Sequence, residues 1–223
     1  MVSQPRRHPL LLLGVVLAAL SAAGAAPPDP AREALPPLAP RSRMPAGRVL
    51  FQDDFSERTL EGWVRDREDV WSVRGGMLRG DLPDRKQEHS FIYAGDDSWT
   101  DYAVDVDICA MRGVDKGVAV RVEGQKSAVG VDLRGPGYQD VIMHVREWPL
   151  GKAQVLNANG VWHHLRVEAR GRHFRVWVNG ALAIDRSESR RARSNGRFAL
   201  AAYTGGVGEC TVYYDNVVVT ELP

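Results

Sequence analysis

Charged, imidazole and aromatic side chains that could bind or act on a ligand gather on three consecutive segments in the middle of the chain. Val118–Glu123, Ala128–Arg134 and Val141–Glu147 each alternate apolar and polar residues, the pattern of strands with one buried face. If these strands are neighbours, their polar residues share the other face. That face would carry Arg121, Glu123, Asp132, Arg134, His144 and Arg146. Tyr138 and Trp148 lie in adjacent loops, where their rings could stack on a sugar. The pattern predicts a polar, concave binding sheet.

The same residue types also support other interpretations. Guanidinium and carboxylate groups side by side match vicinal hydroxyls in a bidentate manner. Glycoside hydrolysis uses two carboxylates, and Glu123 and Asp132 are the candidate pair, with His144 as acid or base near neutral pH. A solvated face with cross-strand ion pairs is an equal alternative. Asp105 and Asp107 are interpreted as surface acids.

The elements that must position these residues are strands throughout. Gly75-Gly76 and Asn179-Gly180 are turn pairs that predict hairpins, and no segment has the period of a long amphipathic helix. The further predicted strands are Arg48–Phe55, Val70–Val73, Met77–Arg79, Phe91–Ala94, Tyr102–Met111, Trp162–Ala169, His173–Val178, Ala181–Arg186, Arg197–Tyr203 and Cys210–Glu221. Trp162 and Trp177 occupy positions that predict burial in the core. The fold class is therefore all-β, a two-sheet antiparallel jelly-roll sandwich.

The N-terminal region predicts export. Residues 1–25 join a basic start, an apolar run and small residues, as in a secretory signal. Residues 26–46 are rich in Pro and Ala and predict a flexible linker, so the domain spans 47–223. We expect a secreted protein, extracellular or periplasmic, without a membrane span in the mature chain. An uncleaved anchor is the alternative, and Arg6-Arg7 leaves both Sec and twin-arginine export open.

Composition and cysteine usage restrict the partners. The chain has 29 Lys and Arg against 28 Asp and Glu, a balance that argues against nucleic acid or an anionic membrane as the partner. A monomer is expected. An exported chain with one pair of cysteines predicts a disulfide between Cys109 and Cys210, and two buried free thiols are the alternative.

Four segments carry a family resemblance. They are Phe51-Gln-Asp-Asp-Phe55 with Trp63, Trp71-Ser-Val-Arg-Gly-Gly-Met-Leu78, Val161-Trp-His-His-Leu-Arg-Val167 followed by Val176-Trp-Val-Asn-Gly180, and Tyr214-Asp-Asn-Val-Val218. With these motifs the chain resembles the concanavalin A-like lectin/glucanase superfamily. Within it, the chain is similar to bacterial secreted 3-keto-disaccharide hydrolase domains. These motifs are packing and turn features, so they are specific for the fold and weak for function.

The resemblance implies functions and residues that the pattern alone does not. It implies a carbohydrate-binding domain, with a hydrolase of 3-keto-glycosides or a laminin-G-like adhesive domain as alternatives. Arg121 and Asp132 stand where similar domains carry an arginine and an acid or amide, while Asp115-Lys-Gly117 replaces their usual Asn-Ser-Gly. No cofactor is required for these roles. A structural calcium ion is implied at Asp53, Asp54 and Asp215.

Overall fold

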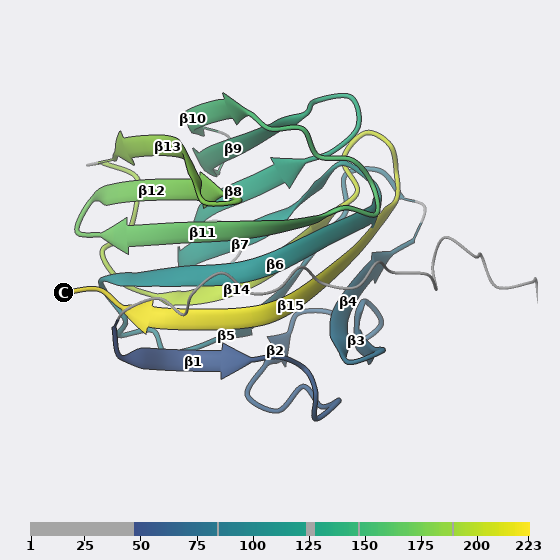
Figure 1. The fold of residues 1–223 in the computed structure, drawn as a ribbon, viewed down its shortest axis with the longest axis horizontal. Coiled ribbons are helices and arrows are strands. Elements are labelled where there is room, and N and C mark those ends of the chain that lie inside the picture. Colours follow the sequence, from purple (N-terminus) through teal and green to yellow (C-terminus); the bar gives the residue numbers. More distant parts are fainter. Residues whose placement is uncertain (1–46, 84, 124–127, 147, 189) are drawn as a thin grey trace, which may run out of the picture.

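The chain forms two stacked antiparallel sheets. The computed structural model describes residues 47–223 apart from 84, 124–127, 147 and 189, and these residues contain strands, turns and no helix. In Figure 1 the eight-stranded sheet lies in front of the seven-stranded sheet. The predicted signal segment 1–25 and linker 26–46 lie outside the described residues. Among the described residues, no helix has the length and apolar character to span a membrane.

All neighbouring strands in both sheets pair antiparallel. The eight-stranded sheet runs β13 (Ala181–Ser187), β12 (His173–Val178), β11 (Trp162–Arg170), β6 (Tyr102–Arg112), β15 (Cys210–Glu221), β4 (Met77–Leu82) and β3 (Trp71–Arg74), with β1 (Val49–Asp53) also pairing with β15. The seven-stranded sheet runs β10 (Trp148–Gln154), β9 (Asp140–Val145), β8 (Val129–Arg134), β7 (Asp115–Val122), β14 (Arg197–Tyr203), β5 (His89–Ala94) and β2 (Val64–Arg65). The predicted fold class is confirmed.

Both predicted turn pairs are present. Gly75 and Gly76 have φ of +61° and +79° between β3 and β4, and Asn179 and Gly180 have φ of +51° and +81° between β12 and β13. Two successive residues with positive φ match the twist of a tight hairpin. Two strands, β2 and β10, were not predicted. β2 has only two residues, and β10 contains a proline and a glycine, which weaken a strand pattern.

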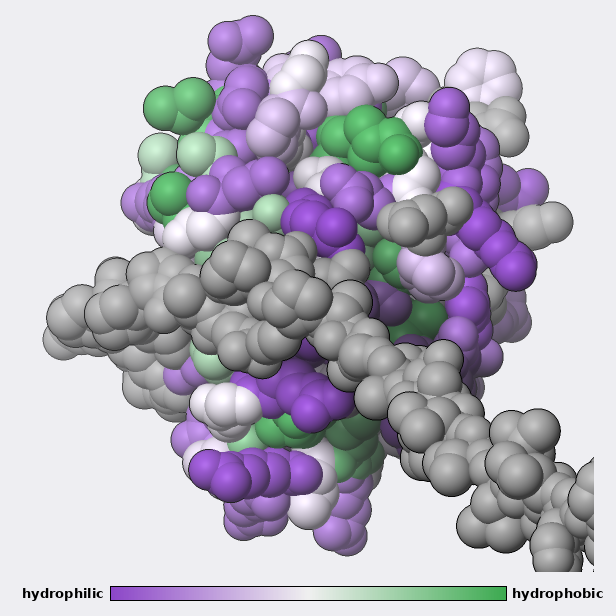
Figure 2. All heavy atoms as spheres, turned by 90° about the vertical axis from the view of Figure 1, so that its right-hand side faces the viewer, coloured by the Kyte–Doolittle hydropathy of each residue, from purple (hydrophilic) through white to green (hydrophobic). Residues whose placement is uncertain are grey.

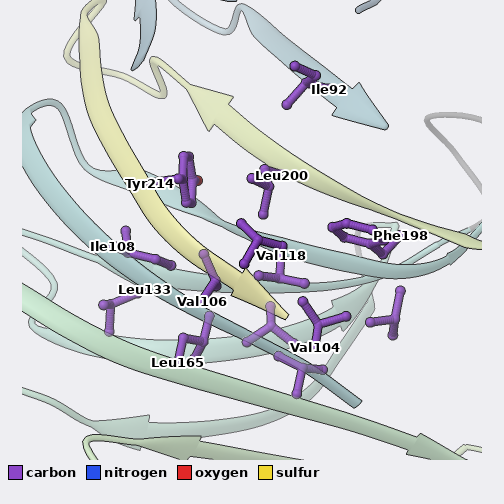
Figure 3. Packing of buried hydrophobic residues seen from close by; sticks show 14 of the residues in the cluster. Ile92, Val104, Val106, Ile108, Val118, Leu133, Leu165, Phe198, Leu200 and Tyr214 are labelled. Atoms are coloured by element: carbon purple, nitrogen blue, oxygen red, sulfur yellow. The ribbon is translucent and has the colours of Figure 1, made fainter. Parts of the chain in front are cut away.

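The core consists of the inward residues of both sheets. Val104, Val106 and Ile108 of β6 face Val118 of β7 and Leu200 of β14 across the sandwich, as Figure 3 shows. All five side chains are at most 1 % exposed. Burial of each contributes about 1.5–3 kcal/mol relative to exposure, so alternation within the strands is the main source of stability.

Two tyrosine hydroxyls join the sheets through the core. The hydroxyl of Tyr214 on β15 accepts a hydrogen bond from the Gly117 amide at 2.9 Å and donates to the Ala201 carbonyl at 2.6 Å. The hydroxyl of Tyr102 on β6 accepts from the Arg121 amide at 2.7 Å. Buried tyrosines need such partners. The two hydroxyls therefore hold the backbone of β7 from the opposite sheet.

Candidate functional site

The outer face of the seven-stranded sheet brings several predicted residues together. Asp132 on β8 pairs in register with Gly117 on β7, and His144 on β9 pairs with Gly130. Val129, Val131 and Leu133 point into the core, so Asp132 and Arg134 point outward with His144. The expected shared face exists for these three residues, and their functional role stays a prediction.

His144 and Asp132 form a close pair. Nε2 of His144 lies 2.9 Å from Oδ2 of Asp132, and Nδ1 lies 2.7 Å from the carbonyl oxygen of Arg146. Burial lowers the pKa of His144, but the hydrogen bond and charge of Asp132 outweigh it, and the net pKa is raised above 6.5. Because both ring nitrogens face acceptors, this geometry favours the imidazolium form, a donor on both sides.

Gly130 makes room for that pair. A Cβ at this position would lie 2.7 Å from Nε2 and 2.8 Å from Cε1 of His144. Gly130 is directly opposite His144 in the ladder. The imidazole ring therefore packs over the glycine, and its Nε2 reaches Asp132. The absence of a side chain at position 130 therefore sets the orientation of the imidazole.

Asp115 joins the site, and its role was not predicted. It begins β7 opposite Tyr203 of β14, and its Oδ1 is buried without a hydrogen-bond partner in the described part of the chain. Burial and the charge of Asp132 raise the pKa of Asp115 to about 6. The sequence feature that could have indicated Asp115 is the Asp115-Lys-Gly117 string, which replaces the Asn-Ser-Gly of similar domains. An acid that titrates near neutral pH is typical of functional sites.

A buried lysine binds the backbone at the start of β7. Lys116 is fully buried, and its Nζ donates to the Val114 carbonyl at 2.8 Å. Burial lowers the pKa of Lys116 to about 8. The amide of Gly135, just after β8, donates to the same carbonyl at 2.9 Å. The backbone beside Asp115 is therefore tied to the end of β8.

Arg134, Asp140 and Lys152 form an ion-pair network beside Asp115. Asp140 is fully buried, and its carboxylate accepts from Arg134 at 2.7 Å and 2.9 Å and lies 2.8 Å from Nζ of Lys152. Burial raises the pKa of Asp140, but these two cations outweigh it and the net pKa is lowered. The guanidinium of Arg134 lies 4.2 Å from the ring centre of Tyr138, so the predicted Tyr138 belongs to this face.

Arg121 and Glu123 were wrongly predicted to share the face. The ladder between β7 and β14 shifts register at a bulge, and Arg121 has φ of +55° there. Its side chain is fully buried, and its guanidinium donates to the carbonyls of Thr100 at 3.0 Å and Arg193 at 3.0 Å. Glu123 is exposed and pairs with Arg193. The bulge interrupts the alternation on which the prediction relied.

Arg146 and Trp148 lie just after β9, at the border of this face. Arg146 is exposed in the turn after β9 with φ of +54°, and its backbone carbonyl contacts His144. Trp148 pairs in register with core-facing Val145, and the guanidinium of Arg191 lies 4.7 Å from its ring centre. The structure therefore does not bring Trp148 to His144.

The outer face of the eight-stranded sheet carries a separate charged network. His164 lies between Asp107, at 2.9 Å, and Asp105, at 3.2 Å, and these hydrogen bonds raise the pKa of His164 to about 9. The predicted core position of Trp177 is wrong, because Arg175 stacks on its ring at 5.2 Å outside the core cluster. Trp162 is half-buried and also outside that cluster.

The predicted disulfide is not formed. Cys109 and Cys210 are buried free thiols. Cys210 belongs to the core cluster, whereas Cys109 alternates with the core residue Ile108 and pairs with Tyr213 on the outer face. Thiols on opposite faces of one sheet cannot be bridged without moving the backbone.

Two of the three predicted calcium residues lie at a pocket of about 410 Å³ at the end of β1. Asp53 and Asp54 line it, but Asp53 already accepts from the Trp63 indole at 2.8 Å and the Phe55 amide at 2.7 Å. The carboxylate of Asp215 accepts from the Asn216 amide at 2.7 Å. Among the described residues no three His, Cys, Asp or Glu side chains form a metal-ligand group. Calcium binding stays a prediction.

Residues 49–220 match the model of the 3-keto-alpha-glucoside-1,2-lyase-like domain. The chain belongs to this family. No curated protein sequence matches this chain. Arg121, which the resemblance placed in the site of this lyase-like domain, is a buried structural residue, whereas Asp132 is on the outer face.

Solved structures similar to this lyase-like domain share its sandwich. The carbohydrate-binding module CBM66 from Bacillus subtilis has a TM-score of 0.61 and 20% identity, covering 73% of this chain and 97% of the module. LamA from Zobellia galactanivorans, in complex with laminaritriose and laminaritetraose, has a TM-score of 0.59 and 14% identity over 79% of this chain and 100% of LamA. The exoplasmic domain of VIP36, bound to calcium and Man3GlcNAc, has a TM-score of 0.60 and 12% identity over 77% of this chain and 88% of that domain. At these identities the likeness shows the fold.

Proposed function

We propose that the outer face of the seven-stranded sheet binds a neutral carbohydrate. The observation that carries the proposal is the Asp132–His144 pair, at 2.9 Å, beside the partly unsatisfied carboxyl of Asp115. Donors and acceptors in a rigid arrangement match the hydroxyls of a sugar. On β8 and β9 they are held by sheet hydrogen bonds, so little ordering is required when a ligand binds.

The charge balance of this face favours a neutral ligand. Asp140 is compensated by Arg134 and Lys152, and Asp132 by His144. An acidic sugar would meet cations that already have carboxylate partners, and it would face the carboxyl of Asp115. A neutral sugar needs no charge compensation, so it loses less on desolvation.

Family membership and fold support the proposal. CBM66 is a carbohydrate-binding module, and the VIP36 and LamA structures contain bound sugars. Figure 2 shows one end of the sandwich with hydrophilic and hydrophobic residues interspersed where grey atoms do not cover it. A broad apolar patch, which an adhesive protein-binding domain would present, is not visible there. Secretion and a monomeric state remain part of the proposal.

A neutral-glycan microarray followed by calorimetry tests the proposal. We expect binding by the wild-type domain and loss of binding in Asp132→Asn, because the amide cannot replace the charged acceptor of His144. The matched control is Asp185→Asn, which breaks a similar pair with His173 on the other sheet. No binding to any glycan, or equal losses in both variants, would contradict the proposal.

Cleavage of 3-keto-glycosides is the second candidate function, favoured by the family match over residues 49–220. In such a reaction a base removes the proton next to the ketone, and the glycosidic oxygen leaves with a proton. Asp115, with its pKa raised to about 6, suits the base, and imidazolium His144 suits the acid. Glu123 is exposed and pairs with Arg193, so the second candidate does not use it.

Incubation with a 3-keto-disaccharide tests the second candidate. We expect release of the second sugar by the wild-type domain at neutral pH, and loss of release in His144→Gln and Asp115→Asn. Unchanged substrate, with and without added divalent metal, would leave binding as the function of this face.

A further inference from the structure

Four aromatic rings line the outer face beyond the polar residues. His89, Phe91 and Tyr93 alternate with core-facing residues along β5, and Tyr203 of β14 lies beside His89. Successive ring centres are 6.0 Å apart from Tyr203 to His89, 5.7 Å from His89 to Phe91 and 6.0 Å from Phe91 to Tyr93. We call these four residues the aromatic strip.

The aromatic strip is continuous with the polar residues. Tyr203 is in register with Asp115 across the β14–β7 ladder, and the carboxyl of Asp115 contributes to raising the pKa of Tyr203, after burial. Strands in a sheet lie about 4.8 Å apart, so the three spacings from β5 to β8 place His89, Phe91 and Tyr93 about 14 Å from Asp132 across the sheet. A single sugar ring cannot span that width.

Except at Tyr203, small residues lie between the rings of β5 and the polar residues of β8 and β9. Ala199 and Ala201 on β14, with Gly117 and Ala119 on β7, occupy the outward positions between them. Phe91 and Tyr93 pack against Ala119 and Ala199 in a second apolar cluster outside the core. His89 is exposed, and Phe91, Tyr93 and Tyr203 are half-buried. Part of each ring therefore remains accessible beside the small residues.

We propose that the aromatic strip is a second subsite that binds further sugar units of a neutral glycan chain. The inference rests on the proposed function, because one end of the chain would lie at Asp132 and His144. Aromatic rings offer large, rigid, apolar surfaces at a low cost in conformational entropy, which suits the apolar faces of pyranose rings. The ligand is therefore an oligosaccharide chain, and affinity increases with chain length.

A chain-length series tests the proposal. The probes are neutral β-linked gluco-oligosaccharides and manno-oligosaccharides, from the monosaccharide to the hexasaccharide, with the array ligands of highest signal added. For wild type we expect affinity to increase with length. Phe91→Ala and Tyr93→Ala should each lower affinity for the longest chains about tenfold, while shorter ligands bind as in wild type.

Variants separate this inference from the proposed function. Phe91→Leu keeps the apolar volume and removes only the ring, so a loss of affinity in this variant is not caused by misfolding. Trp177→Ala is the matched control, because it removes an aromatic ring from the opposite sheet. Affinity that does not depend on length, or normal chain binding by Phe91→Leu, overturns the second subsite while leaving sugar binding intact. No binding of any probe or array ligand overturns both.

Discussion

Replacement of Gly130 by alanine tests the arrangement of the site without removing a polar group. A Cβ there would lie 2.7 Å from Nε2 of His144. To reach an ordinary contact of 3.4 Å the ring must retreat by about 0.7 Å, which can lengthen the 2.9 Å contact with Asp132 to about 3.6 Å. That distance is no longer a hydrogen bond.

The expected loss is that of one charge-assisted hydrogen bond, about 1.5–3 kcal/mol. Partial exposure of both partners, 29% for His144 and 24% for Asp132, favours the lower end. The pKa of His144 is above its unfolded value, so this pair stabilises the fold below about pH 6.5, and its contribution is lost as pH rises through the folded pKa. Gly130→Ala should therefore reduce stability more at acidic pH than at alkaline pH.

Two measurements check this expectation. Histidine NMR titration, with His144 assigned by its absence in His144→Gln, should show a lower pKa for His144 in Gly130→Ala, and urea unfolding at several pH values should show the pH-dependent loss. Gly206→Ala is the control, because a Cβ there meets nothing within 4 Å. An unchanged pKa of His144 in a folded Gly130→Ala protein would refute the reasoning.

Three further predictions follow from burial. Asp115→Asn should stabilise the domain above about pH 6, because the raised pKa of about 6 costs the folded wild type stability between about pH 4 and 6, at most about 3 kcal/mol; equal pH profiles in urea unfolding would contradict this. Arg121→Met should destabilise the fold by about 2–6 kcal/mol, because it leaves the carbonyls of Thr100 and Arg193 without their donor, at about 1–3 kcal/mol each, and a stable variant that merely loses sugar affinity would reinstate Arg121 as a ligand. Alkylation of the denatured, unreduced protein should add a label to both Cys109 and Cys210, and an unlabelled pair in mass spectrometry would show a bridge.

Alternation within strands was sufficient to predict most of the fold. The segments around Val106, Val131 and Val176 carry apolar side chains at every second residue, and these positions are core in the structure. Alternation gives the wrong face where a strand departs from period two. At Arg121 a bulge turns an expected outward residue inward, and no local signal in the sequence marks it.

The candidate site was predictable in part for the same reason. Asp132, Arg134 and His144 follow regular strands, and the structure places them on one face. Asp115 and the aromatic strip were missed because their role depends on which strands lie next to β7, and β14 and β5 are distant in the sequence. The environment of Trp177 depends on two arginines stacked on its ring, which a hydropathy pattern does not reveal.

Tyr102 and Tyr214 hold β7 by backbone atoms at Arg121 and Gly117, so this attachment does not depend on the side chains that the neighbouring strands present outward. A library randomised at Asp132, Ile142 and His144 should therefore retain a folded scaffold while its recognition properties change. Directed evolution of new specificities on this sheet would then resemble the diversification of loops on a constant framework, with the two tyrosines as the positions to leave untouched.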